Sequence, residues 1–330
     1  MPSWKSASPT SPGSPASPEQ ADGQAAGRAG QQAPSRPGPP WRAWVLAARI
    51  PTLSAAVAPV LVGTAMAAAR GAARADVFLG ALAASLLIQI GTNFANDLFD
   101  YRKGADREGR LGPTRVTQTG LLSEAQVARG TLAVFAGAVL LGAYLARVGG
   151  WPVVAMGACA IAAGVLYTAG PWPLGYHGLG DVMVFIFFGL VAVGGTVYVH
   201  ASQWPASALV AGSAVGCTVT AILVVNNLRD LEQDRASGKR TLAVRLGVRG
   251  TRLEYVALVA AAYGLWAVLW RMGELGPAFW LPLLSLPWAA AMVRQVFTQQ
   301  GRALNLTLKG TSRLHLAFSG LLALSFVLGR

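Results

Sequence analysis

Charged residues are scarce in this sequence. Asp, Glu, Lys and Arg make up 12% of the 330 residues, whereas soluble domains carry about 25%. Hydrophobic residues account for 53%, and stretches of about 20 apolar residues, long enough to cross the ~30 Å hydrocarbon core of a bilayer, recur from residue 44 onward. The composition excludes an ordinary soluble globular protein and predicts a polytopic membrane protein.

Cysteine and histidine are also rare. The two cysteines, Cys159 and Cys217, both lie in apolar stretches, which excludes a disulfide framework and a Cys-x-x-Cys metal site. Of the three histidines, His200 and His315 lie outside the polar clusters described below, which argues against triad or zinc chemistry. The net charge of +13 comes from basic residues between apolar spans, a distribution typical of membrane-protein loops and not of nucleic-acid binding.

Residues 1–40 contain almost no large apolar side chains and are rich in Pro, Ser, Gly, Ala and Gln. Such a segment cannot bury enough surface to offset its ordering entropy, so we predict a disordered tail followed by a membrane domain over residues 41–330. The tail lacks the apolar core of a secretory signal, so we expect the first apolar span to direct membrane insertion.

Nine apolar segments predict an all-α bundle of about nine transmembrane helices. The sixth contains Gly212-xxx-Gly216, a spacing that permits close helix packing. The segments cover residues 44–69, 76–99, 125–147, 150–169, 179–199, 204–228, 252–272, 276–296 and 313–329.

Lys and Arg residues are distributed unevenly across this bundle. With nine spans and a cytoplasmic N-terminus, 22 of the 27 fall on the cytoplasmic side. This bias is the positive-inside pattern, so we expect a multi-pass protein of the cell inner membrane with that orientation. The other side receives five basic residues: Arg70, Arg74, Arg147, Arg271 and Arg330.

Two groups of acidic residues lie against apolar spans. Ionisable side chains at the depth of a span are costly and are therefore candidates for function. The first group follows the second span and the other follows the sixth. Their polar members are Asn96, Asp97, Asp100 and Asp106 in the first group and Asn226, Asp230 and Asp234 in the second.

The spacing within these groups predicts a divalent-cation site. Asn96 and Asp100 are four residues apart, and Asn226, Asp230 and Asp234 form an i, i+4, i+8 series, so each set shares a helix face. Stacked carboxylates repel each other, and a shared Mg²⁺ ion, which prefers oxygen ligands and phosphate-bearing substrates, relieves the repulsion. We therefore predict these five residues as magnesium ligands.

The second and sixth spans run in the same direction, so both groups are expected at one membrane face. Facing each other, they would form a cavity that holds a diphosphate between metal ions. We predict that Lys103, Lys239 and Arg240 neutralise the phosphate oxygens. The other basic residues near the first group, Arg102, Arg110 and Arg115, are interpreted as topology determinants.

These motifs resemble those of the UbiA superfamily of intramembrane aromatic prenyltransferases. That family carries Asn-Asp-x-x-Asp after its second helix and Asp-x-x-x-Asp after its sixth. Both motifs occur here, as Asn96-Asp97-Leu-Phe-Asp100 and Asp230-Leu-Glu-Gln-Asp234. The resemblance extends from about residue 41 to the end of the sequence.

Longer stretches resemble the menaquinone branch, which prenylates 1,4-dihydroxy-2-naphthoate. They are Asn226-Asn-Leu-Arg-Asp230 with Gly238-Lys-Arg-Thr-Leu-Ala-Val-Arg245, Asp100-Tyr-Arg-Lys103-Gly-Ala-Asp106, and Tyr167-Thr-Ala-Gly-Pro171 with Gly175-Tyr-His-Gly-Leu-Gly-Asp181. Hydroxybenzoate branches keep a lysine shortly after the tyrosine that corresponds to Tyr167, and this sequence lacks it.

The resemblance implies magnesium-dependent transfer of a polyprenyl group from its diphosphate to the naphthoate, with loss of carbon dioxide and release of demethylmenaquinol. Tyr167 and His177 are candidates for contacting the acceptor. In this interpretation the catalytic residues are Asn96, Asp97, Asp100, Asp106, Asp230 and Asp234, with Asp97 and Asp106 assisting.

Two alternatives remain open from the sequence. One is a prenyltransferase of the same superfamily that uses homogentisate or 4-hydroxybenzoate as acceptor. The other is a cation-coupled transporter, because intramembrane acidic residues are also typical of transport pathways. Transporters usually place such sites near the bilayer midplane, whereas both groups here are predicted at one face.

Overall fold

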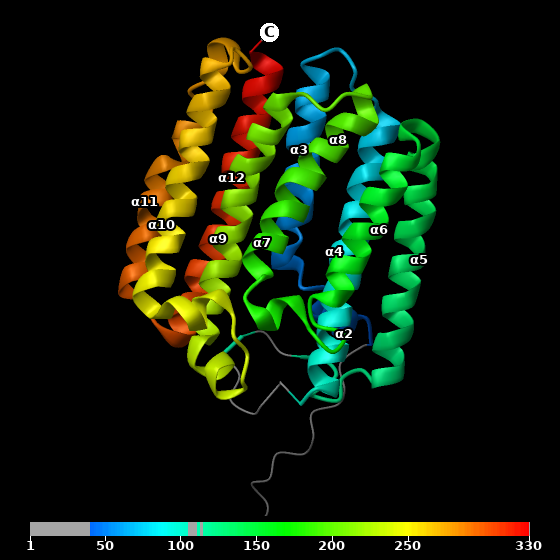
Figure 1. Cartoon of the computed structure of the whole chain (residues 1–330), viewed down its shortest axis with the longest axis vertical. Helices are drawn as coiled ribbons and strands as arrows, with labels where there is room; N and C mark the ends of the chain where they lie inside the picture. The colour runs from blue at the N-terminus through cyan, green and yellow to red at the C-terminus, as the bar shows by residue number, and fades with distance from the viewer. Residues whose placement is uncertain (1–39, 105–110, 113–114, 330) are drawn as a thin grey trace, which may run out of the picture. The chain divides into compact units, whose positions relative to one another are not determined.

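The computed structural model describes residues 40–104, 111–112 and 115–329, and all regular secondary structure in these ranges is helical (Figure 1). This confirms the all-α prediction. The predicted disordered tail lies outside the described residues, except that Pro40 begins the first helix.

The described part of the first half of the chain folds into α-helices and one 3₁₀ segment. Arg49 has a left-handed backbone conformation and Pro51 follows in the next turn, and here the first span bends by 52°. A capping box of Ser123 and Gln126 starts the third span. The elements are α2 (Pro40–Ala48), η1 (Ile50–Thr52), α3 (Ser54–Ala68), α4 (Ala75–Arg102), α5 (Glu124–Gly149) and α6 (Trp151–Leu166).

The second half begins with a short 3₁₀ segment and continues with a series of mostly long helices. One span contains a π-helical stretch, which widens the turn of the backbone within it. The elements are η2 (Leu174–His177), α7 (Gly180–Val184), η3 (Phe185–Val191), α8 (Ala192–Ala201), α9 (Ala206–Ala236), α10 (Leu242–Arg271), η4 (Gly276–Ala278), η5 (Leu281–Ser285), α11 (Leu286–Thr298), η6 (Gly301–Ala303) and α12 (Leu304–Leu328).

Every predicted span corresponds to one helix or to a run of consecutive helical elements in the described residues. Seven are long and apolar enough to cross a membrane, and the bent pair α2–α3 raises that number to eight. The fourth, α6, has 16 residues and is therefore only about 24 Å long. The chain is a multi-pass membrane protein.

Helix boundaries differ from the prediction at the polar groups. The second and sixth spans were expected to end at residues 99 and 228, but α4 continues to Arg102 and α9 to Ala236. Apart from Asp106, which lies outside the described residues, the members of both polar groups therefore lie in the last turns of long helices and not in the loops that follow. Helical structure fixes the i, i+4 relationship on which the predicted metal site depends.

The core lies where α3, α9 and α12 pack together, with α10 and α11 on one side and α5 and α6 on the other (Figure 1). Met66, Phe318 and Leu322 are fully buried there. Large apolar residues of the outer helices, such as Leu132, Leu140 and Leu253, are exposed. In a membrane protein such side chains face lipid, so the outer surface needs no further covering.

Small residues allow the sixth span to approach the fifth closely. The backbone of Gly189 in η3 lies against Gly212 and Gly216 of α9, and a Cβ atom built on Gly189 would be 2.6 Å from the Gly212 carbonyl oxygen. The Gly212-xxx-Gly216 spacing therefore serves helix packing, as the sequence predicts.

We expect Gly189→Ala to destabilise the protein by about 1–3 kcal/mol, because the new methyl group meets backbone that cannot move aside as a side chain does. Thermal unfolding of the purified protein in detergent measures the effect. Gly264→Ala is the matched control, since nothing lies within 4 Å of a Cβ atom at that helical position. Equal melting temperatures for the two variants would contradict the packing role.

Candidate active site

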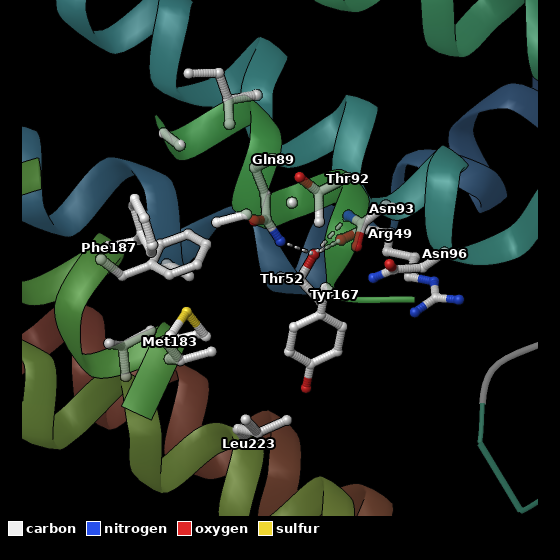
Figure 2. Close-up of a pocket in the computed structure, with 18 of the residues that line it drawn as sticks. Arg49, Thr52, Gln89, Thr92, Asn93, Asn96, Tyr167, Met183, Phe187 and Leu223 are labelled. Atoms are coloured by element: carbon white, nitrogen blue, oxygen red, sulfur yellow. Dashed lines mark hydrogen bonds between the residues drawn. The ribbon is translucent and has the colours of Figure 1, made fainter. Parts of the chain in front are cut away.

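A cavity of about 1400 Å³ lies within the bundle, lined by residues of α4, α6, η3, α8 and α9. Most of its wall is apolar, with Ile88, Phe187 and Leu223 among the lining residues. One end is polar and contains residues of both acidic motifs. Figure 2 shows the part of this cavity that lies between Gln89, Tyr167 and Phe187.

The first motif divides its residues between the cavity and the protein interior. Asn96 and Asp100 line the cavity, and Asn96 accepts a hydrogen bond from Thr168 (2.9 Å). Asp97 is 2% exposed and is absent from the cavity wall. Its two carboxylate oxygens accept the backbone N–H groups of Val116 (3.1 Å) and Thr117 (3.2 Å). Asp97 therefore anchors the segment that carries Arg115.

Asp100 is surrounded by donors from three other parts of the chain. Arg115 donates a hydrogen bond to Oδ2, and the Tyr176 hydroxyl donates to Oδ1 (2.6 Å). The Lys239 ammonium lies 3.6 Å from Oδ1. Asp100 is 2% exposed and Arg115 is 4% exposed, so the negative charge of Asp100 is buried and is compensated by two neighbouring cations.

The second motif lies on one face of α9 as its spacing predicts. Asn226, Asp230 and Asp234 all line the cavity. The Arg229 guanidinium, which is buried, donates to both oxygens of Asp230 (2.8 and 2.6 Å) and to Asn226 (2.9 Å). A bidentate arginine is the geometry that best compensates a buried carboxylate.

Three contacts connect the two motifs. Lys239, which follows the second motif, reaches Asp100 of the first. Tyr176 donates to Asp100 through its hydroxyl, and its carbonyl oxygen accepts the Arg240 N–H (2.8 Å). Asn305 accepts from Arg229 and donates to the carbonyl of Leu111. The structure therefore brings Asp100 and Asp230 to the same end of one cavity.

The predicted diphosphate-binding cations take different positions. Lys239 lines the cavity and lies 4.4 Å from the centre of the Tyr176 ring. Lys103 donates instead to the carbonyl oxygens of Thr168 (2.7 Å) and Gly170 (3.0 Å) and is not part of the wall. Partial burial lowers the pKa of Lys103, and the charge of Lys239 lowers it further, against the opposing effect of Asp100.

Arg240 also lies outside the cavity wall. Its backbone N–H donates to Tyr176 and its carbonyl oxygen accepts from Arg245 Nε (3.3 Å). Among the described contacts, its part is therefore to hold the η2 segment against the loop after α9.

The two residues predicted to contact the aromatic acceptor also take different positions. Tyr167 lines the cavity, and its ring lies beside the open space in Figure 2. His177 stacks on Trp172 with ring centres 4.4 Å apart, and its carbonyl oxygen accepts from Arg245 (2.8 Å). His177 does not line the cavity. Asp106 lies outside the described residues.

The polar end of the cavity suits a hard divalent cation by its donor chemistry. Asn96, Asp100, Asn226, Asp230 and Asp234 offer carboxylate and amide oxygens, which are the ligands Mg²⁺ prefers. No group of three or more Asp, Glu, His or Cys residues gathers at a metal-binding distance within the described ranges. A Mg²⁺ ion here would therefore complete its shell with water or substrate oxygens, as is usual for this ion.

Three residues of this site were not predicted. Arg115 was interpreted as a topology determinant, and Arg229 and Tyr176 were quoted only as parts of longer motifs. Arg229 directly precedes Asp230, and Tyr176 directly precedes His177, so adjacency was the only local signal. The position of Arg115 depends on the contact of its loop with Asp97, which no local pattern reveals.

Comparison with known proteins identifies one family. Residues 56–316 match the UbiA prenyltransferase family. The 1,4-dihydroxy-2-naphthoate octaprenyltransferase of Haemophilus influenzae is 32% identical over 297 residues, which cover 87% of this chain and 96% of that protein. The Mycobacterium tuberculosis protein of the same name is 42% identical over 226 residues, covering 68% of this chain and 77% of that protein.

Solved structures share the fold. A UbiA homologue from Aeropyrum pernix aligns with a TM-score of 0.66 at 17% identity, covering 85% of this chain and 98% of that chain. A UbiA homologue from Archaeoglobus fulgidus, solved with DMAPP and Mg²⁺, aligns with a TM-score of 0.62 at 16% identity, covering 86% and 98%.

We expect Asp97→Ala to release the segment that follows Arg115, because the Val116 and Thr117 amides lose their acceptor. Hydrogen exchange of a peptide covering residues 115–120 measures this release, and exchange should accelerate there more than in α9. Glu124→Ala is the control, since the Glu124 side chain is 44% exposed and pairs with Arg102, which is also exposed. Unchanged exchange in Asp97→Ala would contradict the anchoring role.

Proposed function

The chain belongs to the UbiA prenyltransferase family and is a prenyltransferase, and on this premise we propose that it acts in menaquinone synthesis. It transfers a polyprenyl group from polyprenyl diphosphate to 1,4-dihydroxy-2-naphthoate, with magnesium as cofactor. The products are demethylmenaquinol, diphosphate and carbon dioxide.

The observation that carries this proposal is the combination of two environments in one cavity. Asp100, Asp230 and Asp234 line the polar end, with Arg115 and Lys239 beside them. The remainder of the cavity is mostly apolar. A prenyl diphosphate has the same division, with several negative charges at one end and a hydrocarbon chain at the other.

Two observations support the naphthoate as acceptor. The relatives named above carry that acceptor in their names and match most of this chain. The residues after Tyr167 are Thr-Ala-Gly-Pro-Trp-Pro and lack the lysine of the hydroxybenzoate branches. Family membership also favours the enzyme over the transporter alternative.

The polar residues help to stabilise the leaving group, which is diphosphate. Asn96, Asp100, Asn226, Asp230 and Asp234 would hold the cofactor, which as a Lewis acid supplies stabilisation of the negative charge on a departing diphosphate. Arg115 and Lys239 add fixed positive charge at the same end. Arg229 and Tyr176 keep the carboxylates in place before substrate binds.

The apolar wall protects the electron-poor first carbon of the prenyl group from water. The bond between the first prenyl carbon and the diphosphate oxygen breaks, and its electron pair leaves with diphosphate. Apolar residues such as Phe187 and Leu223 exclude water that would otherwise capture the allylic cation. The ring carbon that bears the carboxylate attacks, and loss of carbon dioxide returns the electron pair of that bond to the ring.

The charge distribution supports an active site at the cytoplasmic face of the cell inner membrane. Both motifs lie at the end of the bundle to which the sequence assigns most of the basic residues. The same orientation places the N-terminal tail, proposed to be disordered, in the cytoplasm. The diphosphate end of the substrate would then face the cytoplasm.

We expect Asp100→Ala and Asp230→Ala each to reduce prenyl transfer by at least about 100-fold, because each removes a carboxylate that would hold the metal ion, and the metal ion stabilises the charge on the leaving group. The assay incubates vesicles containing the protein with polyprenyl diphosphate, Mg²⁺ and a panel of aromatic acceptors, and identifies the product by mass.

Membrane yield and melting temperature serve as folding controls, and Glu124→Ala should retain full activity as an exposed acidic residue at the same end of the bundle. Undiminished transfer by both site variants would exclude the acidic motifs from the reaction. Transfer to hydroxybenzoate or homogentisate, but not to the naphthoate, would refute the proposed acceptor.

Removal of divalent cations should abolish turnover, since oxygen ligands without a metal ion cannot stabilise a departing diphosphate. We expect EDTA to stop the reaction and excess Mg²⁺ to restore it, whereas Na⁺ at equal ionic strength should not. Turnover that persists after exhaustive chelation would remove magnesium from the proposal.

A further inference from the structure

A second polar cluster lies deeper in the cavity than the acidic motifs. It consists of Thr52 in η1 and of Gln89 and Asn93 in α4, joined by the hydrogen bonds drawn in Figure 2. The Thr52 hydroxyl accepts from Gln89 Nε2 (3.2 Å) and from Asn93 Nδ2 (3.0 Å). It donates its own hydrogen to the carbonyl oxygen of Arg49 (2.9 Å).

These bonds determine which way the Gln89 amide faces. A hydroxyl has one hydrogen, and that of Thr52 is used by Arg49. The Thr52 oxygen can therefore only accept, so the NH₂ group of Gln89 must face it. The amide oxygen, Oε1, points away from Thr52 and has no hydrogen-bond partner among the residues that the structure describes.

An unpartnered amide oxygen is unusual in this setting. Gln89 is 8% exposed and lines the cavity. Buried polar atoms are almost always hydrogen-bonded, because an unmade bond in a dry interior is costly. A ligand that donates a hydrogen bond would satisfy this atom, whereas a carboxylate would be repelled by its lone pairs.

The position of Gln89 suits the acceptor ring. Gln89, Asn93, Asn96 and Asp100 follow each other at intervals of four, three and four residues and share one face of α4. Gln89 lies about 10 Å below Asn96 along the helix axis, enough room for a two-ring aromatic molecule beside the diphosphate end. Tyr167, Met183, Phe187 and Leu223 line the other side of this space (Figure 2).

From this geometry we infer that Gln89 Oε1 accepts a hydrogen bond from a phenolic hydroxyl of the aromatic acceptor and orients its ring for attack. The inference rests on the proposed function and deepens it, because it assigns the acceptor's hydroxyl group to a named atom. Withdrawal of the hydroxyl proton toward Gln89 also enriches the ring in electrons. Thr52 and Asn93 are positioning residues, since they hold the amide in this orientation.

The test pairs a protein change with a substrate change. Gln89→Met keeps the length of the side chain and removes its hydrogen-bonding atoms. The substrates are 1,4-dihydroxy-2-naphthoate and its two mono-methyl ethers, each of which has lost one hydroxyl donor. Activity is measured in vesicles with the full chain, as kcat/KM for each acceptor at saturating polyprenyl diphosphate and Mg²⁺.

In the wild type, the ether at the hydroxyl that contacts Gln89 should react about tenfold less efficiently than the diol. In Gln89→Met the kcat/KM for the diol should fall by about tenfold, and the difference in kcat/KM between the diol and that ether should nearly vanish. The KM for polyprenyl diphosphate should stay unchanged. Gln295→Met, the same exchange in α11 and outside the cavity, should behave like the wild type.

Outcomes separate the two proposals. A wild type that prenylates no naphthoate refutes the proposed function. A wild type that is active, with the same diol-to-ether ratios in Gln89→Met, refutes the role of Gln89. If Gln89→Met does not fold, Thr52→Val tests the same point, because it frees the amide to rotate and should reduce the ratio; an unchanged ratio in that variant overturns the inference.

Discussion

Pairing of buried carboxylates with arginine is the interaction on which the rest of the site depends. Asp100 is held by Arg115, and Asp230 is held by Arg229 through both oxygens. A carboxylate buried without such a partner would be neutralised or would destabilise the fold. Each pair holds a carboxylate at the polar end of an otherwise mostly apolar cavity, where its oxygens can bind a cation.

This requirement explains why the loops at this end of the bundle are tied together. Asp97 holds the backbone of the two residues that follow Arg115, whose side chain donates to Asp100. Tyr176 also donates to Asp100, and its η2 segment is joined to Arg240, Tyr167 and Arg245 by hydrogen bonds. Asp97, Lys103 and Arg240 lie outside the cavity wall and hold neighbouring segments. From the sequence, Asp97 was predicted to assist at the site, and Lys103 and Arg240 were predicted to bind diphosphate.

The cavity is divided along α4 in the same way as the chemistry that it is proposed to perform. Asp100 and Asn96 lie near the charged end, and Gln89 lies deeper beside apolar residues such as Phe187. In the proposed mechanism a single helix thus presents metal-binding oxygens for the diphosphate end and a hydrogen-bond-accepting oxygen for the aromatic acceptor at different depths. The regular rise of an α-helix sets the distance between them, so the register of one helix aligns the two substrates.

The sequence by itself determined the membrane class, the succession of about nine apolar helical segments and the two acidic motifs, because these depend on local composition and on the period of the helix. Asn96, Asp100, Asn226, Asp230 and Asp234 were all predicted from spacing, and all line the cavity. Tertiary structure alone decided that Asp97 faces a loop, that His177 stacks on Trp172 and that Arg115 and Gln89 enter the site. Those outcomes depend on contacts between segments far apart in the chain, which no local pattern records.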